Sequence, residues 1–512
     1  MKRKVASIVT AGVKTLIVIF SFGMIVASFL IGWVAKRKVT SAQAYFGGTG
    51  LFGPFVVGFS TMAAVASAFA IVGIPGIIYS TGNTMTFWML SSAAFAMAYM
   101  ILGKKVRAMA ELGPVASLGD ISDLRFNNNR AIKAIMSIVL FLGCVAYLAS
   151  QIKACSTLFA HLLGWNPILA GFVIFGVLTI YTAISGEVGG ILTQAFQGLV
   201  MVIAGVIMIV AFFSITKGFG PLLEVVSTAG KVTDGEITKV FSADILNAWG
   251  VFPGSVAMAW MIIPILGTIG QPQVLTRMYA LKNPKDMPKL GLYASLSHMI
   301  VGFFAVVMGY GALFLVGKGL IKPLASGDQA VFAFADYVGV HAQLFVYAAV
   351  LAAAMSSASL FLSLTSGIIS RDLPSAFGYR FSSEKQMKIS RITIFVLGVL
   401  SILFALTSSE MVAILGTFGW GTLMSATFPV FIIGLLWKKA SSQGVLAGLI
   451  TALGLNIISL ILVRTGFKWP GALPWYVNVI TASIAVTVFI SLFTKGATEE
   501  DLDERVKAVI DL

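Results

Sequence analysis

The chain is a succession of long apolar segments separated by short loops that hold nearly all of its charge. Of its 512 residues, 58% are hydrophobic and 11% are charged, which is far from the composition of an average soluble domain. A helix needs about 20 apolar residues to cross the hydrocarbon core of a bilayer. Thirteen segments meet or approach that length, at residues 12–34, 51–80, 85–102, 132–162, 167–185, 189–215, 247–270, 289–317, 343–370, 391–407, 411–437, 443–463 and 475–494. The sequence therefore predicts an all-α membrane protein with about 13 transmembrane helices.

The net charge of +15 would fit a protein that binds nucleic acid, but the positions of the basic residues do not. Twenty-three Lys and Arg residues, Arg277 among them, lie in one set of alternate loops and in the C-terminal tail, and 11 lie on the opposite side. Loops rich in Lys and Arg stay in the cytoplasm. We therefore expect a multi-pass protein of the plasma membrane, with the N-terminus outside, the C-terminus in the cytoplasm and no nucleic-acid partner. The basic start at residues 2–4 locally favours the opposite orientation.

The segment at 350–372, VLAAAMSSASLFLSLTSGIISRD, is apolar yet rich in hydroxyl groups. Ala353, Ser356 and Ser357 are spaced i, i+3 and i+4, so they share one helix face. Two interpretations stay open at this point. Small residues allow transmembrane helices to pack closely. Hydroxyls together with freed carbonyls also supply the oxygens that a hard cation such as sodium prefers.

Two long segments contain a predicted interruption. GIPG at 73–76 places Pro75 between two glycines, and GTIGQP at 267–272 ends in Pro272. Proline breaks regular helix, and irregular backbone at membrane depth is tolerated only where it is buried or lines a cavity. Interrupted helices at corresponding places in two halves of a chain indicate an inverted-repeat transporter.

This pattern divides the chain into five parts. They are an extra N-terminal span and loop at 1–45, a first inverted repeat at 46–216, a second at 217–440, two C-terminal spans at 441–495 and a cytoplasmic tail at 496–512. The spans contain no paired carboxylates or metal-ligand set of the kind that a catalytic site requires, so we expect no enzyme. A membrane-embedded sensor without transport is an alternative, but the tail is short for a signalling domain.

Three stretches resemble the sodium:solute symporter family, which includes bacterial proline, pantothenate, sialic acid and sugar carriers. They are FGGTGLFGPFVVGFSTMAAVASAFAIVGIPG at 46–76, GQPQVLTRMYALKN at 270–283 and LAAAMSSASLFLSLTSGIISRDL at 351–373. The resemblance covers nearly the whole chain. It implies the LeuT-type fold of five-plus-five inverted repeats. It also implies a secondary active symporter of the bacterial inner membrane, which imports a small solute with sodium by alternating access.

In this family a sodium ion lies between the first and eighth core helices, which correspond here to segments 51–80 and 343–370. By position, the resemblance implies these ligands: the carbonyls of Ala63, Ala66 and Ala353 and the hydroxyls of Ser356 and Ser357. Some members hold a further sodium ion near a TDxxQ motif. This chain reads TQAFQ there, with Gln194 in the acidic position, and Leu360 stands where those members carry a hydroxyl. We therefore expect one sodium ion per transport cycle.

The resemblance also implies a small substrate site between the second, fourth, seventh and ninth segments. Its expected lining residues are Ser67, Phe69, Tyr147, Gln151, Lys153, Thr268 and Gln271. Pro264 and Thr268 replace aromatic residues of proline carriers, which makes proline a weaker candidate although Tyr147 is kept. The stretch IPILGTIG at 263–270 is too apolar for a sugar carrier.

Lys153 is the single charge that we expect well inside a span. A buried intramembrane charge marks a functional site by default, but a lysine near the outer end of a helix can also extend to the headgroups. If Lys153 reaches the site, the substrate is an anion, because an ammonium group in a low dielectric needs a counter-charge. We expect a small organic anion such as a monocarboxylate, or an amino acid. The expected partners are this solute and the lipid bilayer. A monomer is compatible with the sequence, and the oligomeric state stays open.

Overall fold

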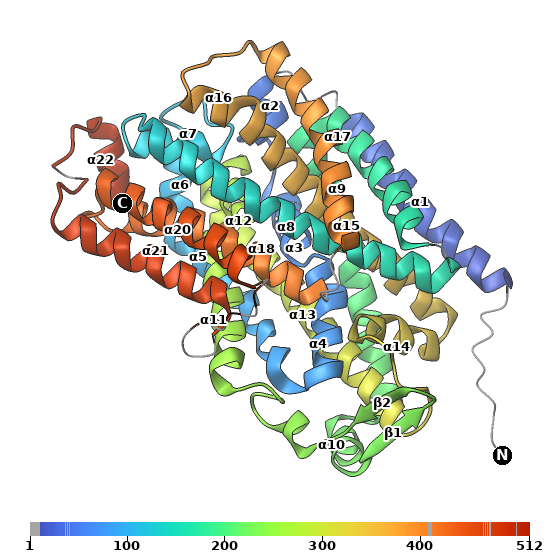
Figure 1. Ribbon diagram of the computed structural model, residues 1–512. Coiled ribbons are helices and arrows are strands. Elements are labelled where there is room, and N and C mark those ends of the chain that lie inside the picture. The colour runs from blue at the N-terminus through green and yellow to red at the C-terminus, as the bar shows by residue number, and fades with distance from the viewer. Residues whose placement is uncertain are drawn as a thin grey trace.

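The computed structural model describes residues 11–512 except positions 36, 38, 40, 165, 408–411, 464, 466, 468, 470–472 and 498. Among the described residues, eleven helices are long and apolar enough to cross a membrane. A bent pair, Pro54–Val65 with Phe69–Thr81, forms a further span, and the shorter apolar helix Gly171–Ile184 occupies the predicted segment 167–185. The prediction of an all-α membrane protein with about 13 spans is confirmed. Figure 1 shows the long helices packed side by side in one bundle.

The elements up to residue 216 contain the first broken helix. In chain order they are α1 (Ala11–Ala35), α2 (Ala42–Gly47), α3 (Pro54–Val65), η2 (Phe69–Gly73), α4 (Ile74–Thr81), η3 (Asn83–Leu90), α5 (Ser91–Ile101), α6 (Gly103–Met109), α7 (Leu118–Arg125), α8 (Arg130–Leu163) and α9 (Pro167–Thr216). α9 comprises two helices that meet at Gly186, where φ is 55° and ψ is −150°. A Cβ at Gly186 would lie 2.5 Å from the carbonyl oxygen of Tyr45, so this bend requires glycine.

The elements from residue 219 to residue 436 contain the second broken helix. They are α10 (Phe219–Thr228), β1 (Lys231–Asp234), β2 (Ile237–Val240), η4 (Ala243–Leu246), α11 (Gly254–Gly270), α12 (Pro272–Ala280), η5 (Pro284–Asp286), α13 (Met287–Gly317), η6 (Gly327–Gln329), α14 (Ala330–Val338), α15 (Val340–Gly367), η7 (Ile368–Asp372), α16 (Leu373–Ala376), α17 (Ser383–Thr407), α18 (Val412–Thr427), η8 (Phe428–Ile433) and α19 (Gly434–Leu436). Three helices follow: α20 (Ser442–Val463), α21 (Trp475–Leu492) and α22 (Glu504–Asp511).

The first break lies earlier than the sequence predicted. α3 ends at Val65, Ala66 has a ψ of 60°, and the chain resumes helical structure at Phe69 with a bend of 53°. Pro75 does not interrupt the chain, because it lies in the first turn of α4, where a missing N–H costs little. The wide turn of η2 precedes it. The expectation that GIPG forms the break is therefore wrong, and the break follows the run of small residues instead.

The second break lies where the sequence predicted it. α11 ends at Gly270, Gln271 is extended with a ψ of 139°, and Pro272 begins α12. Proline favours an extended conformation in the residue before it, and its own fixed φ suits the first turn of a helix. The GQP sequence therefore ends one half-helix and starts the next.

Backbone hydrogen bonds join the two broken helices to each other. Phe52, just before α3, pairs with Leu281, just after α12, as an isolated parallel bridge. The N–H of Phe52 donates to the carbonyl of Ala280 at 3.2 Å, and the carbonyl of Phe52 accepts from the N–H of Lys282 at 2.8 Å. The half-helices α3 and α12 are thus fastened together at one end.

The loops between spans gather at two ends of the molecule. α2, α6, α7, α16 and α22 lie at one end, and α10, α14 and the antiparallel hairpin of β1 and β2 lie at the other (Figure 1). At the first end, the Arg371 guanidinium lies 2.7 Å from a carboxylate oxygen of Asp120, and Lys133 lies 2.6 Å from one of Asp123. The sequence predicts this end to be cytoplasmic.

α15 lies at the centre of the helix bundle. The most apolar window of the span Val340–Ala376 is 89% buried by other parts of the chain, whereas that of Gly12–Ala35 is 33% buried. α15 packs against α9, α8, α3 and α1. The serine-rich helix therefore faces protein on nearly all sides, while α1 presents much of its surface outward.

Candidate functional site

The predicted sodium site lies where α15 meets the end of α3. The hydroxyl oxygen of Ser356 lies 2.7 Å from the carbonyl oxygen of Ala63 and 3.0 Å from that of Ala353. The hydroxyl of Ser357 donates a hydrogen bond of 2.9 Å to the carbonyl of Ala64. All five residues are fully buried. Four of the five residues named from the sequence thus come together, and Ala64 joins them.

The break in α3 explains why these carbonyl oxygens are available. The last carbonyls of a helix have no N–H in a following turn. At the end of α3 the carbonyl of Met62 accepts the N–H of Ala66 at 2.7 Å. The next two carbonyls, those of Ala63 and Ala64, point to the serines of α15 instead. Ala66 is fully buried at the break, and its role as a ligand stays a prediction.

These groups have the chemistry of a site for a small monovalent cation. A serine hydroxyl can donate its proton to a carbonyl, or it can turn its lone pairs toward a cation. The oxygens at the α3–α15 junction come from two helices and carry no formal charge, so an ion bound there keeps its full charge. Transport of that charge would respond to the membrane potential.

The first break is also held by two polar residues of α8. The hydroxyls of Ser67 and Tyr147 lie 2.7 Å apart, and the N–H of Phe69 donates to the Ser67 hydroxyl at 3.2 Å. The amide oxygen of Gln151 accepts the N–H of Ala68 at 3.0 Å. Four of the residues predicted to line the substrate site therefore lie together at the first break, next to the predicted sodium site.

The second break faces α18. The side-chain Nε2 of Gln271 donates a hydrogen bond of 3.1 Å to the backbone carbonyl of Trp420. Within the described part of the chain, Gln271 Oε1 and Trp420 Nε1 are buried and have no hydrogen-bond partner. One is an acceptor and the other a donor. Trp420, whose ring centre lies 6.2 Å from that of Tyr147, was not predicted, because no local pattern in α18 marks it.

Apolar side chains close the space between the two breaks. The ring of Phe361 on α15 lies 4.7 Å from that of Tyr147, and the ring of Phe69 lies 6.1 Å from that of Trp88. Thr268 is fully buried on α11, one turn before Gln271. The predicted substrate residues on α8, α11 and the first break are therefore sealed from solvent in this structure, except for Lys153.

Lys153 differs from the other predicted substrate residues. It follows Gln151 by two positions on α8, which is a rotation of about 200° around a helix, and it is half-buried whereas Gln151 is fully buried. The charge of Lys153 interacts electrostatically with the carboxylate of Asp328 in η6. Burial raises the pKa of Asp328 to about 6, while the N–H of Val412 and the charge of Lys153 lower it. Contact between Lys153 and a substrate stays a prediction.

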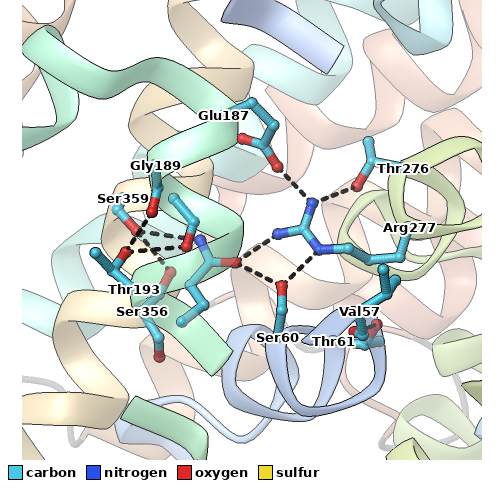
Figure 2. Close-up of polar contacts among 12 residues, drawn as sticks. Val57, Ser60, Thr61, Glu187, Gly189, Thr193, Thr276, Arg277, Ser356 and Ser359 are labelled. Carbon is cyan, nitrogen blue, oxygen red and sulfur yellow. Dashed lines mark hydrogen bonds and ion pairs between the residues drawn. The ribbon is translucent and has the colours of Figure 1, made fainter. Parts of the chain in front are cut away.

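A buried charged cluster lies beside the predicted sodium site (Figure 2). Arg277 of α12 forms an ion pair with Glu187 of α9, and its other nitrogens lie 2.5 Å from Gln194 Oε1 and 2.9 Å from the Ser60 hydroxyl. Arg277 is fully buried, so its predicted place in a cytoplasmic loop is wrong. Glu187 and Arg277 are two further buried charges, each close to an end of its span, and opposite charges can be buried as a pair.

Hydrogen bonds connect this cluster to α15. Gln194 Nε2 donates to the hydroxyl of Ser359 at 3.1 Å, and that hydroxyl donates to the carbonyl of Ser356 at 3.0 Å. A small pocket of about 20 Å³ adjoins the cluster. Its lining includes Glu187, Thr276, Leu360, Ser363, Ser117 and Arg371. The lining of the pocket thus extends from the buried ion pair to the end of the molecule that carries the Arg371–Asp120 ion pair.

Comparisons with known proteins agree with this arrangement. The sequence model of the sodium:solute symporter family matches residues 45–452. The osmoregulated proline transporter OpuE of Bacillus subtilis is 27% identical over 491 residues, which are 93% of this chain and 95% of that protein. The sodium/proline symporter of Escherichia coli K12 is 26% identical over 485 residues, 92% of this chain and 91% of that protein.

Solved structures share the fold. A Na+-coupled sialic acid symporter, in a substrate-bound outward-open state, aligns with a TM-score of 0.74 at 18% identity and covers 95% of this chain and 99% of its own. The transporter Mhp1 of the nucleobase-cation-symport-1 family aligns with a TM-score of 0.50 at 16% identity, over 91% of this chain and 98% of its own. The LeuT-type inverted-repeat fold is therefore confirmed, and the relatives are transporters, not enzymes. The chain belongs to the sodium:solute symporter family, whose members couple solute transport to sodium.

Proposed function

We propose that the protein imports a small zwitterionic amino acid, of which proline is the first candidate, together with one sodium ion. The ion would be held at the junction of α3 and α15, by the carbonyls of Ala63, Ala64 and Ala353 and the hydroxyls of Ser356 and Ser357. The solute would lie between the two breaks. Ala66 remains a candidate ligand, because it stands at the first break.

The choice of solute depends on one observation: Gln271 Oε1 and Trp420 Nε1 are both buried without a hydrogen-bond partner among the described residues. Buried polar atoms are almost always paired. These two unpaired atoms belong to residues joined by the hydrogen bond from Gln271 Nε2 to the Trp420 carbonyl, so a ligand that pairs with both is a reasonable missing partner. The indole N–H can donate to a carboxylate, and the amide oxygen can accept from an ammonium or iminium group. A zwitterion satisfies both atoms without adding net charge to the site. The rings of Tyr147, Phe361 and Trp420 would contact its apolar part.

The names of two relatives support the same class of solute. OpuE of Bacillus subtilis and the Escherichia coli symporter are both named for proline. The sequence alone favoured proline less, because Pro264 and Thr268 stand in place of aromatic residues before the second break. Trp420 and Phe361 bring rings to this region from α18 and α15, so the loss of aromatics from α11 is a weaker objection than the sequence suggested.

A small monocarboxylate is the second candidate. It is favoured by the half-buried Lys153, whose ammonium group could supply a counter-charge from α8. Asp328 already provides a negative charge near Lys153, which reduces the need for an anionic solute. An amino acid remains the first choice for that reason.

Sodium would act by joining the two parts of the site. An ion shared by α3 and α15 holds the first break against α15, and this fixes Ser67 and Phe69 for the solute. A ligand shifts a conformational equilibrium only by its differential affinity for the two states. The sodium gradient, together with about 2.3 kcal/mol per charge for each 100 mV of membrane potential, would then drive accumulation.

We propose one sodium ion per cycle and the orientation given by the basic loops. Gln194 is uncharged and Leu360 has no hydroxyl, so neither adds a ligand charge for a second ion. The end that carries α6, α7 and α22 would face the cytoplasm, and the hairpin of β1 and β2 would face outward. The pocket beside Leu360 and Ser363 would then lie on the path of release into the cell.

Uptake into proteoliposomes tests this function. The purified protein is reconstituted, and uptake of radiolabelled proline is measured with an inward sodium gradient and with an equal potassium gradient. Unlabelled proline, alanine, pyruvate, acetate and glucose are added as competitors. We expect labelled proline to accumulate only with the sodium gradient, and unlabelled proline to reduce this uptake more than the other competitors do. Equal uptake in potassium would contradict sodium coupling, and competition by pyruvate or acetate alone would favour the monocarboxylate.

A further inference from the structure

We propose that the guanidinium of Arg277 is a tethered cation, that is, a positive charge fixed to the chain that occupies a second cation site. This site would bind a sodium ion when Arg277 is replaced by a shorter, uncharged residue. Arg277 would thereby set the ion coupling of the transporter at one sodium per cycle. The inference rests on the proposed one-sodium symport. It concerns the cluster of Figure 2 and not the junction of Ala63, Ser356 and Ser357.

The groups around the guanidinium form a cage of oxygens. Arg277 contacts Oε1 of Glu187, Oε1 of Gln194 at 2.5 Å, the hydroxyl of Ser60 at 2.9 Å and the hydroxyl of Thr276 at 3.4 Å. Gln194 presents its oxygen to the cage and turns its nitrogen to α15. Carboxylate, amide and hydroxyl oxygens are the ligands that hard cations prefer.

The charge of the cage is balanced by Arg277. Glu187 is 5% exposed, and Arg277 is fully buried. Loss of the guanidinium would leave a carboxylate in a low dielectric, and a buried charge without a partner is strongly unfavourable. A monovalent cation restores neutrality with the same oxygens. Ser60 Oγ and Gln194 Oε1 lie 3.1 Å apart, so one small ion can touch both.

An ion could reach this cage from solvent. Glu187 and Thr276 belong to the cage, and both line the small pocket of about 20 Å³ whose lining extends to Arg371. The cage is also connected to the predicted sodium site, because Gln194 bonds Ser359 and Ser359 bonds the carbonyl of Ser356. An ion in the cage would therefore act on the same helix as the transported sodium.

The number of sodium ions bound per protein tests the proposal directly. Purified full-length wild type, Arg277→Ala and Arg277→Gln are titrated with radioactive sodium at pH 8 in detergent, and monodispersity is checked by gel filtration. We expect one bound ion in the wild type and two in each variant. In proteoliposomes, the sodium dependence of uptake should steepen from a Hill coefficient of about 1 toward about 2 in any variant that still transports.

Two control variants separate a cation site from a structural ion pair. Arg277→Lys keeps a tethered charge and should bind one sodium ion. Arg277→Ala combined with Glu187→Gln removes the negative charge of the cage and should also return to one. A merely structural pair would change stability in these variants without changing the ion count.

The outcomes distinguish this inference from the proposed function. If the wild type binds one sodium ion and both Arg277→Ala and Arg277→Gln, folded and monodisperse, also bind one, the tethered cation is refuted and the symport stands. Two ions in the wild type would overturn the inference as well, because the guanidinium would then exclude nothing. No bound sodium in the wild type would instead contradict the proposed function.

Discussion

The hydroxyl of Ser357 donates a hydrogen bond of 2.9 Å to the carbonyl oxygen of Ala64, on the last turn of α3 before the first break. This contact joins the serine-rich central helix to the open end of a half-helix. The neighbouring pair, Ser356 and Ala63, repeats it at 2.7 Å. An ion bound at this junction would therefore be coupled to the position of the first break.

Replacement of both hydroxyls, in Ser356→Ala with Ser357→Ala, should abolish sodium-coupled accumulation. A hydrogen bond or ligand contact to a charged group contributes about 1.5–3 kcal/mol, and each 1.4 kcal/mol is a factor of about ten in affinity. We expect sodium affinity to fall by at least about a hundredfold for the pair. Sodium titration of the purified protein measures this.

Thr365→Val provides the matched control for the serine variants. Thr365 is equally buried on α15, but its hydroxyl bonds the carbonyl of Phe361 on its own helix. Its removal should leave sodium affinity within about twofold, since it takes no part in the junction. Unchanged sodium affinity in the double serine variant, with the protein folded, would exclude the junction as the ion site.

Trp420→Phe should weaken solute binding without weakening sodium binding. The change keeps a ring beside Tyr147 but removes an unpaired indole N–H that the proposed carboxylate would accept from. We expect the apparent KM for proline to rise about tenfold, the effect of losing one charge-assisted hydrogen bond of about 1.5 kcal/mol. Uptake as a function of proline at saturating sodium measures it.

Trp475→Phe is the control for this variant, because Trp475 packs on Phe418 of the same α18 and not on Tyr147. Its KM should match that of the wild type. An equal loss in both variants would point to a general weakening of α18 and not to a lost solute contact.

Gly419→Ala should destabilise the protein. A Cβ at this position would lie 2.8 Å from the backbone nitrogen of Tyr147 and 2.9 Å from its Cα, and backbone atoms cannot rotate away. Overpacking of this kind costs about 1–3 kcal/mol. Gly454→Ala in α20 meets no atom within 4 Å and should be neutral or stabilising, because alanine favours helix. Thermal unfolding in detergent compares the two.

Asp328 should make stability depend on pH. Its pKa is raised by burial from 3.8 to about 6, against the effects of the Val412 N–H and the Lys153 charge. A carboxyl with a raised pKa stabilises the fold when protonated, so this contribution is present below about pH 4 and is lost as the pH rises through about 6. The full effect is of order 3 kcal/mol.

The comparison of wild type with Asp328→Asn isolates this effect from the other titrating groups. We expect the wild type to gain thermal stability relative to Asp328→Asn as the pH falls from 7.5 to 4, by an amount set by the shift of about two pKa units. Parallel curves for the two proteins would mean that the Asp328 carboxyl does not titrate in this range.

The spans and the second break could be predicted because their signals are local. A stretch such as 132–162 is too apolar and too long for anything but a buried or membrane helix. Pro272 fixes its own φ and disfavours the helical conformation at Gln271, so the break at GQP could be predicted from the local sequence. Pro75 misled the prediction because proline also suits the first turn of a helix, and only the path of the whole chain decides between the two.

The rest of the site depends on contacts between distant segments. Ser356 and Ser357 could be named from their spacing on one face, and the carbonyl of Ala64 could have been added from the rule that the last turn of a helix leaves carbonyls unpaired. Trp420 lies in a segment whose sequence indicates only close packing. Arg277 looked like a loop residue because its partners, such as Glu187, lie far away in the sequence.

The bridge between Phe52 and Leu281 has a consequence for biosynthesis. Phe52 is synthesised early, and its hydrogen-bond partners at Ala280 and Lys282 are synthesised much later, because they follow it far along the chain. Until the chain has been translated through α12 and Lys282, the N–H and the carbonyl of Phe52 lack these hydrogen-bond partners. The N-terminal half of the transporter therefore cannot complete its backbone pairing before the second broken helix has been synthesised.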